Sequence, residues 1–358
     1  MPECARSWDA TRVRRPDGGA VRCLLRCLAM RRSLVIAVAL PFAFALGCGT
    51  SNSDAPPTDD ATSDTSTQVD DVAADAGDTS PIADTRGTDT ADSSGEGDAS
   101  PKDSAPDAFV DEAGTWSLVW SDEFDGKDGS EIDRTKWTYD DPQSGKYNKE
   151  LQYYAPGTAN AEQRGGNLII TAKTDGADKQ TCWYGTCRYT SARVITKGLY
   201  ATKYGRIAAR IQIPRGQGLW PAFWLLGDDI DAVSWPACGE IDVMENIGKE
   251  PLRDHGTLHA TGFDKGASTD AKAALGADFH VYAVEWDAKG IRFFLDDVGY
   301  STITPADVPA GGKWAFDHPF FLLLNVAVGG GWPGDPDSTS TFPQTMKVDW
   351  VRVYTKAP

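Results

Sequence analysis

The sequence predicts an all-β fold, an antiparallel β-sandwich or barrel, for the C-terminal two-thirds of the chain. From Thr115 onward, Trp, Tyr, Phe, Val and Ile recur in short runs. Gly, Asp, Asn and Pro interrupt these runs at roughly ten-residue intervals, which is the spacing of short strands joined by turns. Helical periodicity is nearly absent, so we expect short helices only at 131–137 and 269–277.

The clearest apolar runs are predicted strands. Each is rich in β-branched or aromatic residues and is bounded by turn residues, which distinguishes it from a buried helix segment. No internal repeat is visible among them. In chain order the expected strands are 117–120, 167–172, 206–213, 281–286, 291–295, 320–326 and 346–354.

The net charge divides the chain into two parts. Residues 49–112 carry 17 acidic side chains and two basic ones, Arg86 and Lys102, while the whole chain has a net charge of −17. The acidity therefore belongs to this segment, and the remainder is close to neutral. A segment of Asp, Ser, Thr, Ala, Gly and Pro cannot bury enough apolar surface to fold, so we interpret 49–112 as a disordered linker. Residues 113–358 form one predicted domain, a monomer, and the absence of a basic stripe argues against nucleic acid as a ligand.

The segment before the linker has the features of an export signal. Met30-Arg-Arg is followed by an apolar run that ends in small residues and is too short to span a membrane comfortably. Residues 30–48 are therefore a predicted signal peptide, and 1–29 an extension upstream of the true start. Ala45-Leu-Gly-Cys48 resembles a bacterial lipoprotein cleavage box, which implies lipidation of Cys48 and a cell-envelope location. The alternative is an ordinary signal peptide of a secreted protein.

Three cysteines lie within the predicted domain. Cys182 and Cys187 flank Trp183-Tyr-Gly-Thr186, and in an exported protein we expect them to form a disulfide that closes a small loop. A metal site is the alternative, but no second Cys or His pair stands at zinc spacing. Cys238 is then unpaired, and we expect it to be buried.

Cys238 directly precedes a stretch in which acidic and apolar residues alternate. Glu240 and Asp242 share one face of a strand, whereas Glu245 is out of phase by one residue. A β-bulge near Val243-Met244 would bring all three carboxylates to one face. Side chains that lean together could then approach the separation of about 5 Å that a retaining glycosidase needs. Close carboxylates cannot all ionise freely, so at least one pKa should be raised. A solvated acidic strand is the alternative, which the aromatic residues just upstream disfavour.

Gly239-Glu-Ile-Asp-Val-Met-Glu245 resembles the E-[IL]-D-x-x-E motif of family 16 glycoside hydrolases. Other segments resemble further parts of that family, in the same order along the chain. They are Trp120-Ser-Asp-Glu-Phe-Asp-Gly126, Asn148-Lys-Glu-Leu-Gln-Tyr-Tyr154, Tyr204-Gly-Arg206, Gly218-Leu-Trp-Pro-Ala-Phe-Trp224, Asn325-Val-Ala-Val-Gly-Gly-Gly-Trp-Pro-Gly334 and Val348-Asp-Trp-Val-Arg-Val-Tyr354.

The resemblance implies a jelly-roll sandwich with a substrate cleft across its concave sheet. It implies that Glu240 is the nucleophile, that Glu245 is the acid/base and that Asp242 holds Glu240 by a hydrogen bond. The six-residue motif resembles that of laminarinases, agarases and carrageenases. Within this group, Glu150-Leu-Gln-Tyr-Tyr154 and Gly331-Trp-Pro-Gly334 are most similar to laminarinases, which implies an endo-hydrolase of β-1,3-glucan. Two alternatives stay open: a relative acting on mixed-linkage glucan or an algal galactan (agar or carrageenan), and a glucan-binding module without catalysis. Subsite number, product length and pH optimum are not predicted.

Six further residues are predicted to bind the polysaccharide. Flat tryptophan faces can stack on pyranose rings, and polar side chains can bond to sugar hydroxyls. For each tryptophan a core position is the alternative, above all for Trp224, since it and Phe223 point to opposite faces. For His259 the alternative is a structural histidine. The candidates are Trp220, Trp224, Trp332, Asn148, Arg206 and His259.

No cofactor is expected for catalysis, because the four histidines and the acids form no metal cage near the catalytic strand. The resemblance does imply a structural Ca²⁺ on the convex face, held by Glu123, Asp349 and the backbone oxygen of Gly166. Oxygen ligands from both ends of the domain would hold the sandwich together. The alternative for Asp349 is a charged residue on the outer face of a terminal strand.

Overall fold

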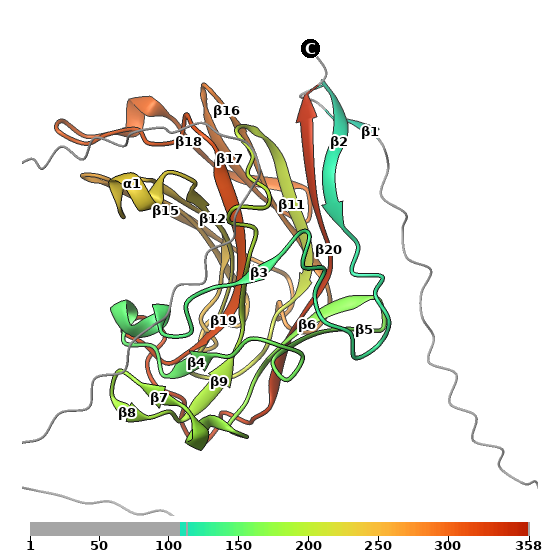
Figure 1. Cartoon of the computed structure of the whole chain (residues 1–358). Helices are drawn as coiled ribbons and strands as arrows, with labels where there is room; N and C mark the ends of the chain where they lie inside the picture. Colours follow the sequence, from blue (N-terminus) through green and yellow to red (C-terminus); the bar gives the residue numbers. More distant parts are fainter. Residues whose placement is uncertain (1–107, 112–113, 357–358) are drawn as a thin grey trace, which may run out of the picture. The chain divides into compact units, whose positions relative to one another are not determined.

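The computed structural model describes residues 108–111 and 114–356 (Figure 1). These residues form two large β-sheets whose strands pair antiparallel, packed face to face, together with two small two-stranded sheets. The predicted all-β sandwich is confirmed, with the jelly-roll architecture that the resemblance implied. Among the described residues, no helix is long and apolar enough to cross a bilayer.

The outer sheet has nine strands. Its backbone hydrogen bonds connect the two ends of the domain, because the long C-terminal strand β20 pairs with β2 and β6 on one side and β11 on the other. In spatial order the strands are β1 (Ala108–Asp111), β2 (Gly114–Asp122), β20 (Gln344–Lys356), β11 (Gly205–Gln212), β16 (His280–Asp287), β17 (Gly290–Leu295) and β18 (Val298–Ile303), with β6 (Asn167–Ala172) and β5 (Ala161–Arg164) joined through β20.

The second sheet has seven strands and carries the acidic stretch. The spatial order is β15 (Phe263–Asp270), β14 (Arg253–Ala260), β13 (Glu240–Glu245), β12 (Leu219–Gly227), β19 (Phe320–Val328), β10 (Arg193–Ile195) and β3 (Thr138–Tyr139). Strand β13 therefore lies near the middle of the sheet, with neighbours on both sides that fix its backbone.

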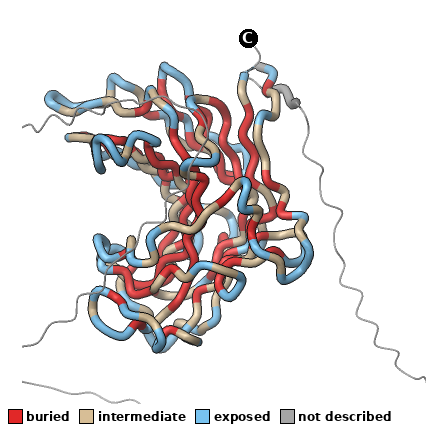
Figure 2. Tube along the Cα trace, viewed as in Figure 1, coloured by how far each residue is buried: buried red, intermediate tan, exposed pale blue. Residues whose placement is uncertain are grey.

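The apolar core fills the space between the two sheets (Figure 2). It includes Ile207 of β11 and Val284 of β16 from one sheet, and Leu322 and Leu324 of β19 from the other, all fully buried. All nine residues of β19 are buried. A strand covered on both faces is expected to be continuously apolar, and β19 is so except at Asn325.

The short elements differ from the prediction. Neither expected helix forms: 131–137 is a turn segment, and 269–270 end strand β15. The helical turns are instead α1 (Ile230–Val233), η1 (Ser144–Asn148), η2 (Ala177–Lys179) and η3 (Pro305–Asp307). The small sheets pair β4 (Gln152–Tyr154) with β9 (Tyr189–Ser191), and β7 (Thr181–Cys182) with β8 (Gly185–Thr186).

The predicted linker boundary is also corrected. Residues 108–111 form strand β1, which pairs with β2, so the sheet begins inside the segment assigned to the linker. The predicted extension 1–29, the signal peptide 30–48 with Cys48, and the linker up to 107 lie outside the described residues and stay predictions.

Candidate active site

The predicted β-bulge in β13 is confirmed, and it places the three acids together. On β12, Phe223 lies opposite Met244 and the next residue, Trp224, lies opposite Asp242, so Val243 has no partner. The register with β14 shifts in the same interval. The extra residue lets Val243 and Met244 both enter the core at 0% exposure, while Glu245 returns to the face of Glu240 and Asp242.

That face is the floor of a cleft of about 760 Å³ over the seven-stranded sheet. Alternation along the strands sorts the side chains: Phe223 of β12 packs in the core, whereas Trp224 lines the cleft, as predicted. Strand β19 contributes Phe321, Leu323 and Ala327 to an apolar floor beside the acids. The cleft is therefore a long depression with apolar surface on one side and carboxylates on the other.

Each outer carboxylate accepts a hydrogen bond from a tryptophan. The indole Nε1 of Trp235 donates to Oε2 of Glu240 at 3.0 Å, and that of Trp220 donates to Oε1 of Glu245 at 2.9 Å. Trp235 precedes the strand in the chain, whereas Trp220 belongs to β12. Two independent elements thus orient the two carboxylates and leave one oxygen of each without an indole donor.

His259, on β14 opposite Glu240, lies at the same cluster. Its Nε2 is 3.1 Å from Oδ2 of Asp242 and 4.0 Å from Oε1 of Glu240, and its Nδ1 contacts the carboxylate of Asp264. One donor atom each from Glu240, Asp242 and His259 lies within 4.8 Å of the others. The structure therefore places His259 beside the acids and not in the lining of the cleft, and it engages both ring nitrogens with carboxylates, those of Asp242 and Asp264.

The electrostatics of the cluster fit the proton transfers of a glycosidase. Burial raises the pKa of Glu240 to about 8, and the charge of Asp242 adds to the rise. Burial also raises the pKa of Asp242 to about 8, although a hydrogen bond with Glu240 opposes this. Burial and Asp242 raise the pKa of Glu245 well above its ordinary value. The three carboxyls therefore keep at least one proton among them at neutral pH.

Four of the five remaining candidates lie in or beside the cleft. Trp220, Trp224 and Asn148 line the cleft. The Trp224 ring has its Nε1 bonded to Oδ1 of Asn325 at 2.8 Å. Trp332 does not line the cleft directly, but its ring contacts that of Trp220 edge-on, with centroids 5.4 Å apart.

The prediction for Arg206 is wrong. Arg206 is the second residue of strand β11 in the other sheet, and its side chain is buried. It forms ion pairs with Glu285 (Nη1–Oε1 3.1 Å) and Asp297. The arginine that does line the cleft is Arg193 of β10, which the sequence prediction missed. A signal was present, since a charged residue stands there within the apolar run Ala192-Arg193-Val194-Ile195.

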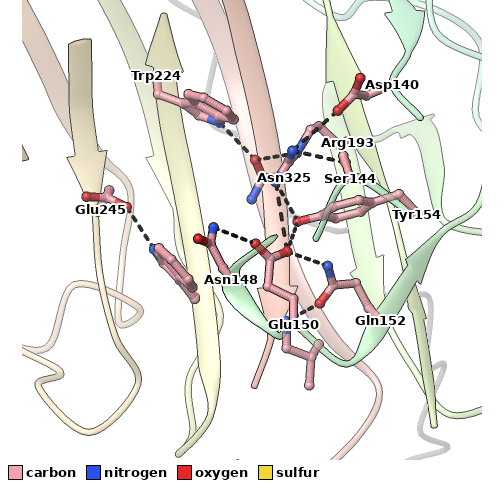
Figure 3. A network of polar contacts seen from close by, with 12 residues as sticks. Asp140, Ser144, Asn148, Glu150, Gln152, Tyr154, Arg193, Trp224, Glu245 and Asn325 are labelled. Atoms are coloured by element: carbon pink, nitrogen blue, oxygen red, sulfur yellow. Dashed lines mark hydrogen bonds and ion pairs between the residues drawn. The ribbon is translucent and has the colours of Figure 1, made fainter. Parts of the chain in front are cut away.

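Arg193 and a second missed residue, Glu150, organise one end of the cleft (Figure 3). Arg193 donates to Oδ1 of Asn325 at 3.1 Å and to the Tyr154 hydroxyl at 3.1 Å. Glu150, only 2% exposed, accepts from Asn148 Nδ2 at 3.0 Å, Gln152 Nε2 at 2.6 Å and Tyr154 at 3.0 Å. The network holds Asn148 at the cleft wall, where its amide can bond to sugar hydroxyls, while the N–H groups of the buried Arg193 are taken up by protein partners, including Asp140 and Ser144.

The residues predicted to bind calcium fit that ion poorly. Arg352 donates to both carboxylate oxygens of Glu123, at 3.1 and 2.9 Å, and Arg210 donates to Asp349 at 2.7 Å. Gly166 lies in the turn between β5 and β6. Calcium prefers carboxylates that no guanidinium neutralises. A structural calcium stays a prediction, and the proposed mechanism uses none.

The predicted disulfide between Cys182 and Cys187 is confirmed, and Cys238 is free and buried, as expected. The bridge closes the hairpin of β7 and β8. At the turn of this hairpin, Trp183 donates to the backbone oxygen of Glu150, and Tyr184 donates to that of Leu151. The hairpin therefore packs against the segment that carries Asn148 and Glu150.

Comparison with known proteins agrees with this geometry. A family model described as glycosyl hydrolases family 16 matches residues 158–352. The "Beta-glucanase" of Rhodothermus marinus is 41% identical over 261 residues, which cover 68% of this chain and 87% of that protein.

Two solved structures share both fold and sequence with this chain. The laminarinase catalytic domain from Thermotoga maritima MSB8 is 40% identical with a TM-score of 0.63, covering 68% of this chain and 99% of that domain. The endo-beta-1,3-glucanase from Pyrococcus furiosus is 38% identical with a TM-score of 0.65, covering 71% and 99%. From the sequence match, the shared fold and the acidic strand together, the chain belongs to glycoside hydrolase family 16.

Proposed function

We propose that this protein is an endo-acting hydrolase that cleaves β-1,3-glucan with retention of configuration. The observation that carries the proposal is the pair Glu240 and Glu245 on one face of bulged β13, each held by an indole N–H at the floor of a long cleft. The similar proteins named above are a beta-glucanase, a laminarinase and an endo-beta-1,3-glucanase, which supports this substrate over the alternatives.

In the first step, Glu240 attacks the anomeric carbon of the sugar on the non-reducing side of the scissile bond. Glu245 gives its proton to the departing glycosidic oxygen, so the leaving chain departs as a neutral alcohol. The raised pKa of Glu245 keeps that proton available at neutral pH. The bond that forms is an ester between Glu240 and the sugar, and the bond that breaks is the glycosidic C–O bond.

In the second step, the ionised Glu245 removes a proton from water, whose oxygen attacks the same anomeric carbon and displaces Glu240. Two inversions at one carbon give net retention. The Trp235 N–H bonds to the Glu240 carboxylate, which favours the ionised form that the first step needs and the second step regenerates. Asp242, hydrogen-bonded to Glu240, and His259 beside it hold the nucleophile's orientation.

The cleft walls position the polysaccharide. Trp220 and Trp224 offer partly exposed ring surface to pyranose rings, while Asn148, held by Glu150, can bond to hydroxyls and Arg193 fixes the cleft wall. A neutral substrate fits the near-neutral charge of the chain outside residues 49–112.

The test is release of reducing ends by the purified protein from laminarin, curdlan, lichenan, agarose and κ-carrageenan in parallel. Fast release of short oligosaccharides from laminarin is expected. Release from a galactan alone would keep the mechanism and replace the substrate. Binding of laminarin without release from any polymer would favour a glucan-binding module.

We also propose that the protein is exported and anchored through a lipid on Cys48. The support is the sequence alone, namely the apolar run that ends in Ala45-Leu-Gly-Cys48. Mass spectrometry of the native protein should find an acylated N-terminal Cys48 in the membrane fraction, and Cys48→Ser should move the protein to the soluble fraction. A native soluble protein with an unmodified N-terminus would contradict the anchor.

A further inference from the structure

A second depression lies beside the catalytic cleft, with a volume of about 480 Å³. Its lining comes from the disulfide-closed hairpin, from the segment before β4, and from the loop after β19. We call it the Trp183 pocket, and its lining includes Lys149, Leu151, Trp183, Tyr184, Arg188 and Asp335.

The pocket and the cleft lie on opposite sides of one segment. Asn148 and Glu150 line the cleft, whereas the intervening Lys149 and the next residue, Leu151, line the Trp183 pocket. The loop after β19 borders both: Gly331 lines the pocket and bonds to the Asn148 oxygen at 3.0 Å. The next residue, Trp332, contacts Trp220 in the cleft. A chain leaving the cleft past Trp220 therefore meets this loop and then the pocket.

Trp183 is exposed although its position is fixed. Its side chain is 47% exposed, yet its Nε1 donates to the Glu150 backbone oxygen at 2.7 Å. Tyr184 packs edge-on against it, with centroids 5.2 Å apart, and the disulfide closes the hairpin on which both lie. An aromatic ring held in place at the surface loses little conformational freedom when a ligand stacks on it, which is a property of binding sites.

The remaining lining suits a sugar. Lys149 and the Arg188–Asp335 ion pair, 3.2 Å between Nη2 and Oδ2, supply exposed groups that can donate to or accept from hydroxyls. The Arg188 guanidinium lies over the Tyr184 ring, so Trp183 is the ring that stays available for stacking. An aromatic face bordered by polar groups matches a pyranose, which has an apolar face and a hydroxylated rim.

We propose that the Trp183 pocket is a remote subsite, which binds glucose residues of the same glucan chain whose scissile bond lies in the cleft. This rests on the proposed function for the substrate class. The pocket then adds affinity for long chains only, because a short oligosaccharide fills the cleft without reaching Trp183. It would also favour attack on polymers over their short products.

The test is kcat/KM of the full chain on β-1,3-gluco-oligosaccharides of increasing length and on laminarin, for wild type and Trp183→Ala. Wild-type kcat/KM should continue to rise with length beyond the point where the variant's rise stops. On laminarin the variant should lose about three- to tenfold, mainly through KM, with short substrates unchanged. Hydrolysis of the short substrates by wild type tests the proposed function separately.

Matched variants separate a binding role from an effect on the cleft. Trp183→Phe keeps a flat ring but loses the donor to Glu150, so it should retain most of the preference for long chains. Val298→Ala, at an exposed apolar residue of the β17–β18 hairpin in the other sheet, should match wild type at every length. If Trp183→Ala fails to fold, Arg188→Ala, which removes a polar rim group, should give the same length dependence.

Three results would overturn the subsite. Equal loss at all lengths would mean that Trp183 acts through Glu150 on the cleft. No loss at any length would mean that the pocket binds no substrate. If Trp183→Ala bound insoluble curdlan more weakly than wild type but showed the same dependence of kcat/KM on chain length, the pocket would bind a separate glucan chain.

Discussion

Trp235 donates its indole N–H to Glu240 and Trp220 donates to Glu245. In the proposed mechanism, each tryptophan therefore affects a different limb of the pH dependence of kcat/KM. Each donor stabilises an ionised carboxylate and so lowers its pKa, against the larger effect of burial. Trp235→Phe should raise the pKa of Glu240 and move the acidic limb of kcat/KM to higher pH, with about tenfold lower activity on that limb. Trp220→Phe should instead move the basic limb to higher pH.

The measurement is the pH dependence of kcat/KM on laminarin for wild type and both variants. Because the carboxyls titrate as a coupled set, the comparison depends on which limb moves and not on assigning each value to one residue. A shift of the same limb in both variants would contradict the separate roles of Glu240 and Glu245.

Glu240 and Glu245 can also be distinguished by chemical rescue. Glu240→Ala should lose at least about a thousandfold in kcat on laminarin while still binding it, because no nucleophile is left. Azide can attack the same carbon in its place and gives an azide product of inverted configuration. Glu245→Ala keeps the nucleophile and forms the ester from an aryl β-glycoside, whose phenolate departs without a proton from Glu245, so its azide product should have retained configuration. Proton NMR of the products decides, and retained configuration from Glu240→Ala would contradict its assignment as nucleophile.

At the scale of elements, the bulge in β13 makes a prediction about phase. Deletion of Val243 gives a regular strand in which Glu240, Asp242 and Glu245 stand two residues apart and still share a face. The shortened protein should keep measurable activity, with a lower melting temperature because a fully buried valine is lost. Insertion of one alanine after Val243 puts Glu245 six positions after Glu240, which is the same face of a regular strand but about 7 Å farther along it, so the two carboxyls should lie too far apart and activity should be abolished.

Circular dichroism and reducing-end release would be measured on both proteins. The insertion is the matched control, since it changes the same strand by one residue in the opposite direction. If the deletion and the insertion were both folded and equally inactive, the bulge would supply more than the phase and spacing of Glu240 and Glu245.

Strands and the catalytic face were predictable because period-two alternation and the bulge are local properties. The sheet that a strand joins is not local. Arg193 and Arg206 each stand in a short apolar strand, yet β10 pairs with β19 in the cleft sheet and β11 pairs with β20 in the other. Only long-range pairing separates them, so Arg206 was chosen wrongly and Arg193 was missed. The expected helix at 269–277 failed for a related reason, since 269–270 pair with β14.

Glu150 was missed because its role depends on partners far along the chain. Within its segment only Asn148 was predicted to bind substrate, whereas the role of the buried Glu150 carboxylate depends on Tyr154 and on Arg193, whose Nη2 lies 3.9 Å away. A charged residue at 2% exposure needs such partners, and a sequence without relatives does not show them.

At the scale of the whole molecule, a buried polar contact connects the two sheets across the core beyond the cleft. Asp254 of β14 is fully buried, and its Oδ2 accepts from the Tyr300 hydroxyl of β18 at 3.3 Å. The sheets approach closely here because the neighbouring strand residue is Gly256, where a Cβ would lie 2.4 Å from Phe293 and 2.6 Å from the Tyr300 oxygen. Burial raises the pKa of Asp254 well above its ordinary value.

A raised folded-state pKa means that the folded protein binds a proton that the unfolded chain releases. The stability from Asp254 is therefore complete below the unfolded pKa, near about 4, and is lost as pH rises toward the folded value. Asp254→Asn keeps an oxygen for the Tyr300 hydroxyl and removes the titration. Its melting temperature should fall less than that of wild type between pH 5 and 9, each pKa unit being equivalent to about 1.4 kcal/mol.

Calorimetry of both proteins across this range makes the comparison, with catalytic Glu245→Gln as a second variant that removes another raised carboxyl. The two variants should each flatten the profile, and the double variant should flatten it further but by less than the sum, because the charge of Glu245 contributes to the raised pKa of Asp254. A profile for Asp254→Asn parallel to that of wild type would show that the buried carboxyl relaxes or hydrates instead of holding its proton. The contact between the sheets would then be independent of pH, and the alkaline limit of stability would belong to the catalytic acids alone.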